Sequence, residues 1–183
     1  MKVFAWYKKI VNYISMSKIL KKEIGNQADI TRPDLELKGE SYIKKIVNDH
    51  PEINIRLTEA PQAFILPFDE SGHANRDGTQ KVLVVWLAFQ PTHVTYSNIL
   101  STVKQVASDF RNIAVFKYFT GIAIVPFLRK SNGECDRIVR VGIKQEGFQK
   151  LGKLTLDDML REEMVDGIGF TWYWEKEKLS TDV

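Results

Sequence analysis

The sequence predicts a single α+β domain with a mainly antiparallel sheet of about six strands, helices on one face of that sheet, and an amphipathic helix at the N-terminus. Two observations lead to this fold class. Apolar residues recur at helical spacing in some segments and alternate at every second position in others. Hairpin turns join the strand-like segments, without a regular alternation of strand and helix. We therefore expect residues 1–25 to form the N-terminal helix and residues 26–183 to form the domain, because 183 residues suffice for one core.

Two helices open the chain. Apolar residues at helical spacing predict the first over residues 2–24, and Gly25 is a typical stop. The second is expected over residues 41–48, with Ser41 as its cap and Pro51 preventing its continuation.

Three strand-like segments follow. Alternating apolar residues predict a half-buried strand over residues 53–57. The apolar runs 63–68 and 81–89 predict an antiparallel pair joined by a long polar loop over residues 69–80. The β-branched and aromatic residues of the second run favour a central strand.

The next segment returns to helical spacing, with Thr95 or Ser97 as the cap. Its apolar stripe comprises Ile99, Leu100, Val103, Val106, Ala107 and Phe110. A strand is then expected over residues 113–119.

A hairpin is predicted where residues 121–129 and 137–144 flank the turn Asn132-Gly133, a dipeptide that favours tight turns. Pro126 interrupts the first of these strands. Because proline cannot donate to a strand ladder, we expect an edge or a bulge there.

The C-terminal part predicts a short helix after Thr155, stopped by Gly167, and a last strand over residues 168–174. The aromatic cluster Trp-Tyr-Trp at residues 172–174 could stack on bases or on a ligand. Alternating aromatics of this kind also occur as core on one face with a partly exposed tyrosine on the other.

Charge is distributed unevenly. The net charge is +3, but residues 1–25 carry six lysines and one acid, so that 6 − 1 = +5, and the remainder sums to 20 − 22 = −2. The basic character therefore belongs to the leading segment. Its apolar stripe is wider than one core contact needs, so three interpretations stay open: packing on the sheet, lying on an anionic membrane surface, or docking into a partner or subunit interface.

The residues expected to bind a partner come from that segment and from the loop over residues 69–80, because exposed polar loops are a common place for function. They are Trp6, Lys8, Lys9, Lys18, Lys21, Lys22, His73 and Arg76.

The stretch "DITRPDLELKGE" at residues 29–40 resembles the PD-(D/E)xK nuclease pattern of an acid followed by acid-x-lysine. The resemblance implies that Asp29 and Glu36 bind Mg²⁺ and that Lys38 helps to position the attacking water at a phosphate. Asp34 could replace Asp29. The alternative is a solvated connector between two helices, since so permissive a motif also arises by composition.

The leading expectation is a non-enzymatic binding or assembly protein, without a cofactor, that engages a protein partner or forms a homo-oligomer. A Mg²⁺-dependent nuclease and a peripheral membrane protein are the alternatives, and nucleic acid is a further possible partner. The single cysteine, Cys135, and the lack of any apolar run of about 18 residues indicate a cytoplasmic protein.

Overall fold

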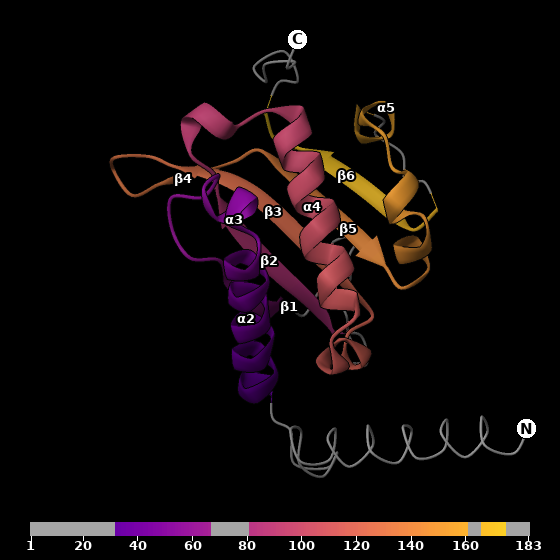
Figure 1. The fold of residues 1–183 in the computed structure, drawn as a ribbon. Helices are drawn as coiled ribbons and strands as arrows, with labels where there is room; N and C mark the ends of the chain where they lie inside the picture. Colours follow the sequence, from indigo (N-terminus) through magenta and orange to yellow (C-terminus); the bar gives the residue numbers. More distant parts are fainter. Residues whose placement is uncertain (1–31, 67–80, 161–165, 175–183) are drawn as a thin grey trace, which may run out of the picture. The chain divides into compact units, whose positions relative to one another are not determined.

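A computed structural model describes residues 32–66, 81–160 and 166–174 (Figure 1). The chain divides into two units, Met1–Leu35 and Glu36–Val183, and the sheet with its helices belongs to the second. The α-helices of the described residues are α2 (Arg32–Asp49), α3 (Pro51–Asn54), α4 (Tyr96–Arg111) and α5 (Leu156–Leu160). The strands are β1 (Gln62–Leu66), β2 (Val82–Ala88), β3 (Gly121–Arg129), β4 (Cys135–Arg137), β5 (Val139–Lys144) and β6 (Ile168–Trp172). The expected α+β fold with a mostly antiparallel sheet of six strands is confirmed.

The sheet has the order β1-β2-β3-β5-β6, and β4 also pairs with β3. All neighbouring pairs are antiparallel except β2 and β3, which run parallel. A parallel pair needs a crossover connection, and α4 supplies it. The sheet is therefore mixed, and the sequence had not indicated its one parallel pair.

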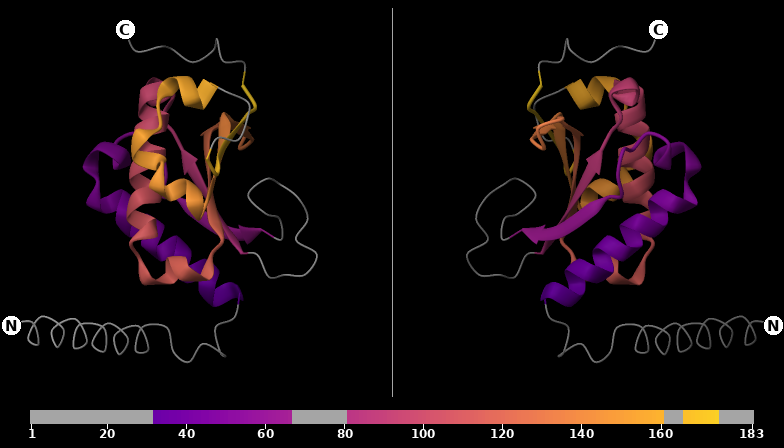
Figure 2. Two further views of the ribbon diagram at one scale, coloured as in Figure 1. Left: turned by 90° about the vertical axis from the view of Figure 1, so that its right-hand side faces the viewer. Right: turned by 90° about the vertical axis from the view of Figure 1, so that its left-hand side faces the viewer.

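The described α-helices lie on one side of the sheet, which we call the helix-covered face (Figure 2). A Cβ added at Gly39 of α2 would lie 2.9 Å from Cδ1 of Leu83, so the glycine lets this helix approach β2 closely. On β6, the ring of Trp172 contacts Tyr96 of α4 at 5.5 Å, and its Nε1 donates to the carbonyl of Met159 in α5 at 2.9 Å. The three helices thus seal the same face.

Helix α4 follows the sequence expectation. Thr95 is its cap, accepting a hydrogen bond from the backbone nitrogen of Asn98 at 3.2 Å. Every member of the predicted apolar stripe is buried. Because the stripe repeats at helical spacing, it faces the sheet along the whole helix.

Three expectations about local structure were wrong. Helix α2 begins at Arg32 and not at residue 41, because a proline such as Pro33 is tolerated in the first turn of a helix. Residues 53–57 form the end of α3 and a turn, with a single bridge from Leu57 to Phe89. Residues 114–118 form a 3-10 helix, where a strand had been expected.

The predicted hairpin and bulge are both present. Gly133 has φ 87°, a conformation that favours glycine, and its nitrogen donates to the carbonyl of Lys130 at 3.0 Å. Further along, Ile124 pairs with Val141 but Phe127 pairs with Arg137, so residues 125–126 oppose residues 138–140. The β4–β5 segment therefore carries one extra residue, which defines a β-bulge.

Pro126 lies at this bulge and not at an edge of the sheet. Its carbonyl accepts from the backbone nitrogen of Ile138 at 3.0 Å, so its own nitrogen faces the bulged segment. Proline lacks a backbone N–H, and here that missing donor falls where the pairing of β3 with β4 and β5 is already interrupted by the bulge.

Candidate functional site

The opposite side of the sheet carries none of the described α-helices, and we call it the helix-free face (Figure 2). Strand register defines its members, since paired residues point to the same side. They are Gln62, Phe64, Val82, Val84, Trp86, Ala88, Gly121, Ala123, Val125, Phe127, Arg129, Cys135, Arg137, Arg140, Gly142, Lys144, Gly169 and Thr171.

Part of this face is apolar. Val82, Val84, Ala123 and Val125 form a second hydrophobic cluster, between 0% and 4% exposed, with Phe64 and Trp86 packed against it. The side chains of the cluster are small, and the larger rings of Phe64 and Trp86 pack beside them. The apolar cluster thus lies on β2 and β3, beside the strands β4 and β5 that carry basic residues.

The charged residues at the described strand positions of the helix-free face all have the same sign. Among its strand positions are Arg129, Arg137, Arg140 and Lys144, and none is Asp or Glu. Arg129 is held by Glu59, whose Oε1 accepts from Nε at 3.0 Å and from Nη2 at 2.6 Å. Residues 36–183 have no net positive charge in sequence. Their strands nevertheless present basic side chains on the helix-free face.

Arg137 lies between two aromatic rings. Its guanidinium carbon is 5.5 Å from the ring centroid of Trp86 and 5.9 Å from that of Tyr173. Trp86 in turn makes edge-to-face contacts with Phe64 at 5.4 Å and Phe127 at 5.5 Å. Aromatic faces attract cations, so this arrangement orients the guanidinium plane.

We name Trp86, Phe127, Arg129, Arg137 and Tyr173 the Arg137 patch. Arg137 is exposed and Tyr173 is 48% exposed, whereas Trp86 is half-buried. Among the described residues no carboxylate forms an ion pair with Arg137. The patch therefore presents a guanidinium that rings, and not an acid, hold in place.

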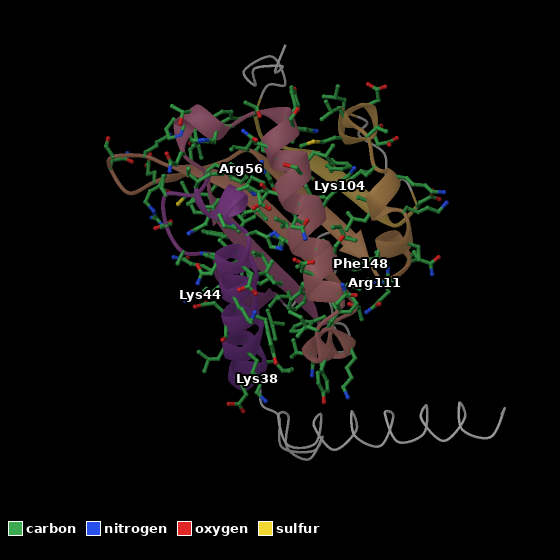
Figure 3. The ribbon with its side chains drawn as sticks, viewed as in Figure 1. Lys38, Lys44, Arg56, Lys104, Arg111 and Phe148 are labelled. Carbon is green, nitrogen blue, oxygen red and sulfur yellow. The ribbon has the colours of Figure 1, made fainter. Side chains whose placement is uncertain are left out.

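The helix-covered side is charged differently. Figure 3 labels basic side chains on two of its helices, Lys38 and Lys44 on α2 and Lys104 and Arg111 on α4. Lys44 pairs with Glu40, and Lys45 pairs with Asp49. Arg111 lies over the ring of Phe148 at 6.0 Å, on the side opposite to the Arg137 patch. The solvent surface of this layer is thus of mixed charge.

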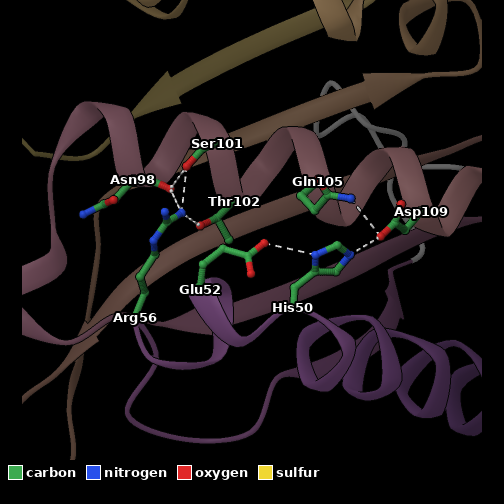
Figure 4. Close-up of polar contacts among 8 residues, drawn as sticks. All are labelled: His50, Glu52, Arg56, Asn98, Ser101, Thr102, Gln105 and Asp109. Atoms are coloured by element: carbon green, nitrogen blue, oxygen red, sulfur yellow. Dashed lines mark hydrogen bonds and ion pairs between the residues drawn. The ribbon is translucent and has the colours of Figure 1, made fainter.

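A polar cluster joins the start of α3 to α4 (Figure 4). His50 contacts Asp109 through Nε2 at 2.6 Å and Glu52 through Nδ1 at 3.0 Å, and Asp109 also accepts from Gln105 at 2.9 Å. The hydrogen bond to Asp109 is the main cause that raises the pKa of His50, and the Glu52 contact adds to it. Because both ring nitrogens contact carboxylates, the side chain of His50 links the start of α3 to α4.

Arg56 makes a second link to α4. Its Nη1 donates to Oγ of Ser101 at 2.7 Å, to Oγ1 of Thr102 at 3.0 Å and to the carbonyl of Asn98 at 3.4 Å (Figure 4). These donors are turned inward to the helix. Arg56 therefore contributes to the attachment of α3 and presents less of its guanidinium to solvent.

The nuclease-like residues occupy a helix. Glu36 and Lys38 both lie in α2, where a separation of two residues turns side chains about 200° apart around the helix axis. Glu36 accepts a hydrogen bond from the backbone nitrogen of Ile65 at 2.9 Å. This nitrogen lies on the outer edge of β1, the first strand of the sheet order. The strand on which the motif would place these residues is absent from the described residues 32–49. Asp29 lies outside the described residues.

Glu40 acts on the same edge one helical turn later. Its Oε2 accepts from the backbone nitrogen of Ala63 at 3.4 Å. The hydrogen bond from Lys44 lowers the pKa of Glu40, and the Ala63 contact contributes. Two carboxylates thus cover donors that an edge strand would otherwise expose.

The predicted partner-binding residues lie outside the described residues, so they stay predictions. They are Trp6, Lys8, Lys9, Lys18, Lys21, Lys22, His73 and Arg76. The Arg137 patch was missed, except that the cluster over residues 172–174 had been singled out for stacking. Within that cluster Trp172 faces the helices and Tyr173 belongs to the patch. A signal was available in the basic residues that interrupt the apolar run "RIVRVGIK".

In the part of the chain that the structure describes, no group of three or more His, Cys, Asp or Glu side chains is placed to hold a metal ion. None of the helices there combines the length and apolar character needed to cross a bilayer.

Comparison with family models, with curated proteins and with solved structures finds no match to this chain.

Proposed function

We propose that this protein is a non-enzymatic binding protein that engages an anionic macromolecule through the helix-free face, centred on the Arg137 patch. One observation carries the proposal. Arg137 is exposed, is oriented by the rings of Trp86 and Tyr173, and forms no ion pair with a carboxylate of the described residues.

The chemistry of guanidinium explains why this arrangement suits recognition. Its planar fork of five donors matches carboxylate or phosphate oxygens with two parallel hydrogen bonds. Rings that hold the plane reduce the side-chain entropy lost on binding. Tryptophan, tyrosine and arginine are also the residue types enriched at the centres of interfaces.

The rest of the charge distribution supports a partner of negative charge. Arg140 and Lys144 share the face with Arg137, and residues 1–25 of the sequence add +5. Two copies that met through this face would bring like charges together, so charge complementarity favours a different molecule. The lysine-rich segment remains a predicted second contact.

Retention of the full chain on heparin tests the proposal, because heparin is a polyanion without bases. We expect Arg137→Gln to elute at clearly lower salt than the unaltered protein. Arg111→Gln is the matched control, since it removes one ring-stacked arginine from the helix-covered side. Equal elution shifts for the two variants would refute the proposed surface.

A further inference from the structure

We infer that the anionic partner is a single-stranded nucleic acid whose bases stack on Tyr173 and Trp86 while its phosphates follow the basic side chains of β4 and β5. The inference rests on the proposed function and names the chemical class of its partner. It needs two kinds of group on one surface, and the helix-free face has both.

The first kind is an accessible ring. Tyr173 is 48% exposed and lies beside Arg137, and Trp86 is half-buried on the other side of the same guanidinium. Bases stack on such rings only when they are unpaired, because the bases of a duplex are already stacked on each other. Aromatic rings therefore favour a single strand over a duplex.

The second kind is a line of cations. Arg137, Arg140 and Lys144 come from consecutive strands of one chain segment and all point to the helix-free face. At about 3.3 Å per residue they extend over about 20 Å, a length that accommodates several nucleotides. Single-strand binding proteins combine a basic track of this kind with stacking rings.

Other anionic partners use less of this surface. An acidic polypeptide or an anionic lipid surface would satisfy the cations but has no unpaired bases for the rings. A duplex would offer phosphates alone, apart from its grooves. Among these partner classes, only a single-stranded nucleic acid would contact both Arg137 and the two rings, so we favour it.

The test measures binding of the full chain to a fluorescently labelled single strand of sixteen thymidines by anisotropy. The comparison probes are a duplex of the same length, inorganic polyphosphate, polyglutamate and vesicles containing phosphatidylserine. We expect the single strand to bind most tightly. Tyr173→Ala should weaken it by about tenfold, because one stacking ring is lost. Polyphosphate binding should weaken clearly less, because there the ring only orients the guanidinium of Arg137. Tyr173→Phe keeps the ring and should bind like the unaltered protein.

Salt dependence supplies an independent readout. Arg137→Gln should reduce the slope of log K against log salt by about 0.7 for the single strand, since one phosphate contact is lost. Arg111→Gln should leave the slope unchanged. Each variant is first shown by circular dichroism to be folded.

The outcomes separate this inference from the proposed function. If Tyr173→Ala has no effect and strand, duplex and polyphosphate bind alike, the inference is overturned while the anionic partner stands. If polyglutamate or vesicles bind with the same dependence on Arg137 and the strand does not, the partner belongs to that other class. If no anionic probe responds to Arg137→Gln, both proposals fall.

Discussion

On the helix-covered face of the sheet, α2, α4 and α5 bury the strand side chains, and the polar groups between helices pair with one another, as His50 does with Asp109. On the helix-free face, a small apolar cluster lies beside side chains of one charge sign, and the exposed guanidinium of Arg137 is held by rings. Both sets of residues alternate along the same strands. The comparison teaches that helices cover the apolar side chains of one face, whereas the other combines a smaller buried cluster with an exposed arginine and tyrosine.

The largest expected difference concerns aromatic truncation. Phe110→Ala on the helix-covered face should cost about 3–5 kcal/mol, because its buried ring contacts Phe116 and Phe119. Phe64→Ala on the helix-free face should cost about 1–2 kcal/mol, because that ring is only half-buried. Urea denaturation measures both. Equal losses would break the comparison by showing that the two faces are packed alike.

Neighbouring valines give a sharper pair. Val85 and Val84 are adjacent in β2, are both buried and point to opposite faces. Val85→Ala should cost about 2 kcal/mol, and the loss of strand propensity is common to both variants. We expect about half that loss, about 1 kcal/mol, for Val84→Ala, because no described α-helix lies over it. The same loss at both positions would mean that the helix-free face is equally sealed in solution.

The edge of β1 offers a smaller effect. Glu36→Ala removes the acceptor of the Ile65 backbone nitrogen and should cost about 1 kcal/mol. It should also increase concentration-dependent self-association, measured by light scattering, because an edge donor is uncovered. Ser41→Ala, at an exposed position of the same helix, is the control and should change stability by less than about 0.5 kcal/mol. A larger loss in the control would contradict this assignment.

The smallest effect depends on pH. Because the pKa of His50 is raised in the folded state, its imidazolium adds stability below an unfolded pKa of about 6.5, and that stability is lost as pH rises through the folded value. His50→Gln should remove this part of the pH dependence, which amounts to about 1 kcal/mol or less. Unfolding free energies at acidic and alkaline pH measure it. Identical pH profiles for the variant and the unaltered protein would contradict the link between α3 and α4.

The sequence was sufficient for elements with long periodicity. The stripe of α4, the runs of β2 and β3, and the turn at Gly133 all follow from spacing and local conformation. Short segments failed because a few alternating residues also fit one turn of helix. In a strand, Ile53 and Ile55 would point to the same side. In the structure Ile53 is buried and Ile55 is 64% exposed, because they lie at a helix end and in a turn.

The Arg137 patch could not be predicted for a different reason. Its members come from β2, β3, β4 and the residue that follows β6, so their proximity depends on strand order and register. The parallel pairing of β2 with β3 sets Trp86 beside Phe127, and no local pattern specifies that pairing. The motif around Glu36, in contrast, was visible in the sequence but lies in a helix.

The bulge opposite Pro126 has a consequence for which way arginines point. In an unbroken strand, residues an odd number of positions apart project to opposite sides, and Arg137 and Arg140 are three apart. The inserted residue changes this parity, so the odd-numbered positions before it and the even-numbered positions after it share one side. A chain shortened by one residue between them would turn one of the two arginines into the hydrophobic core. The extra residue opposite Pro126 therefore places Arg137 and Arg140 on the same side of the sheet.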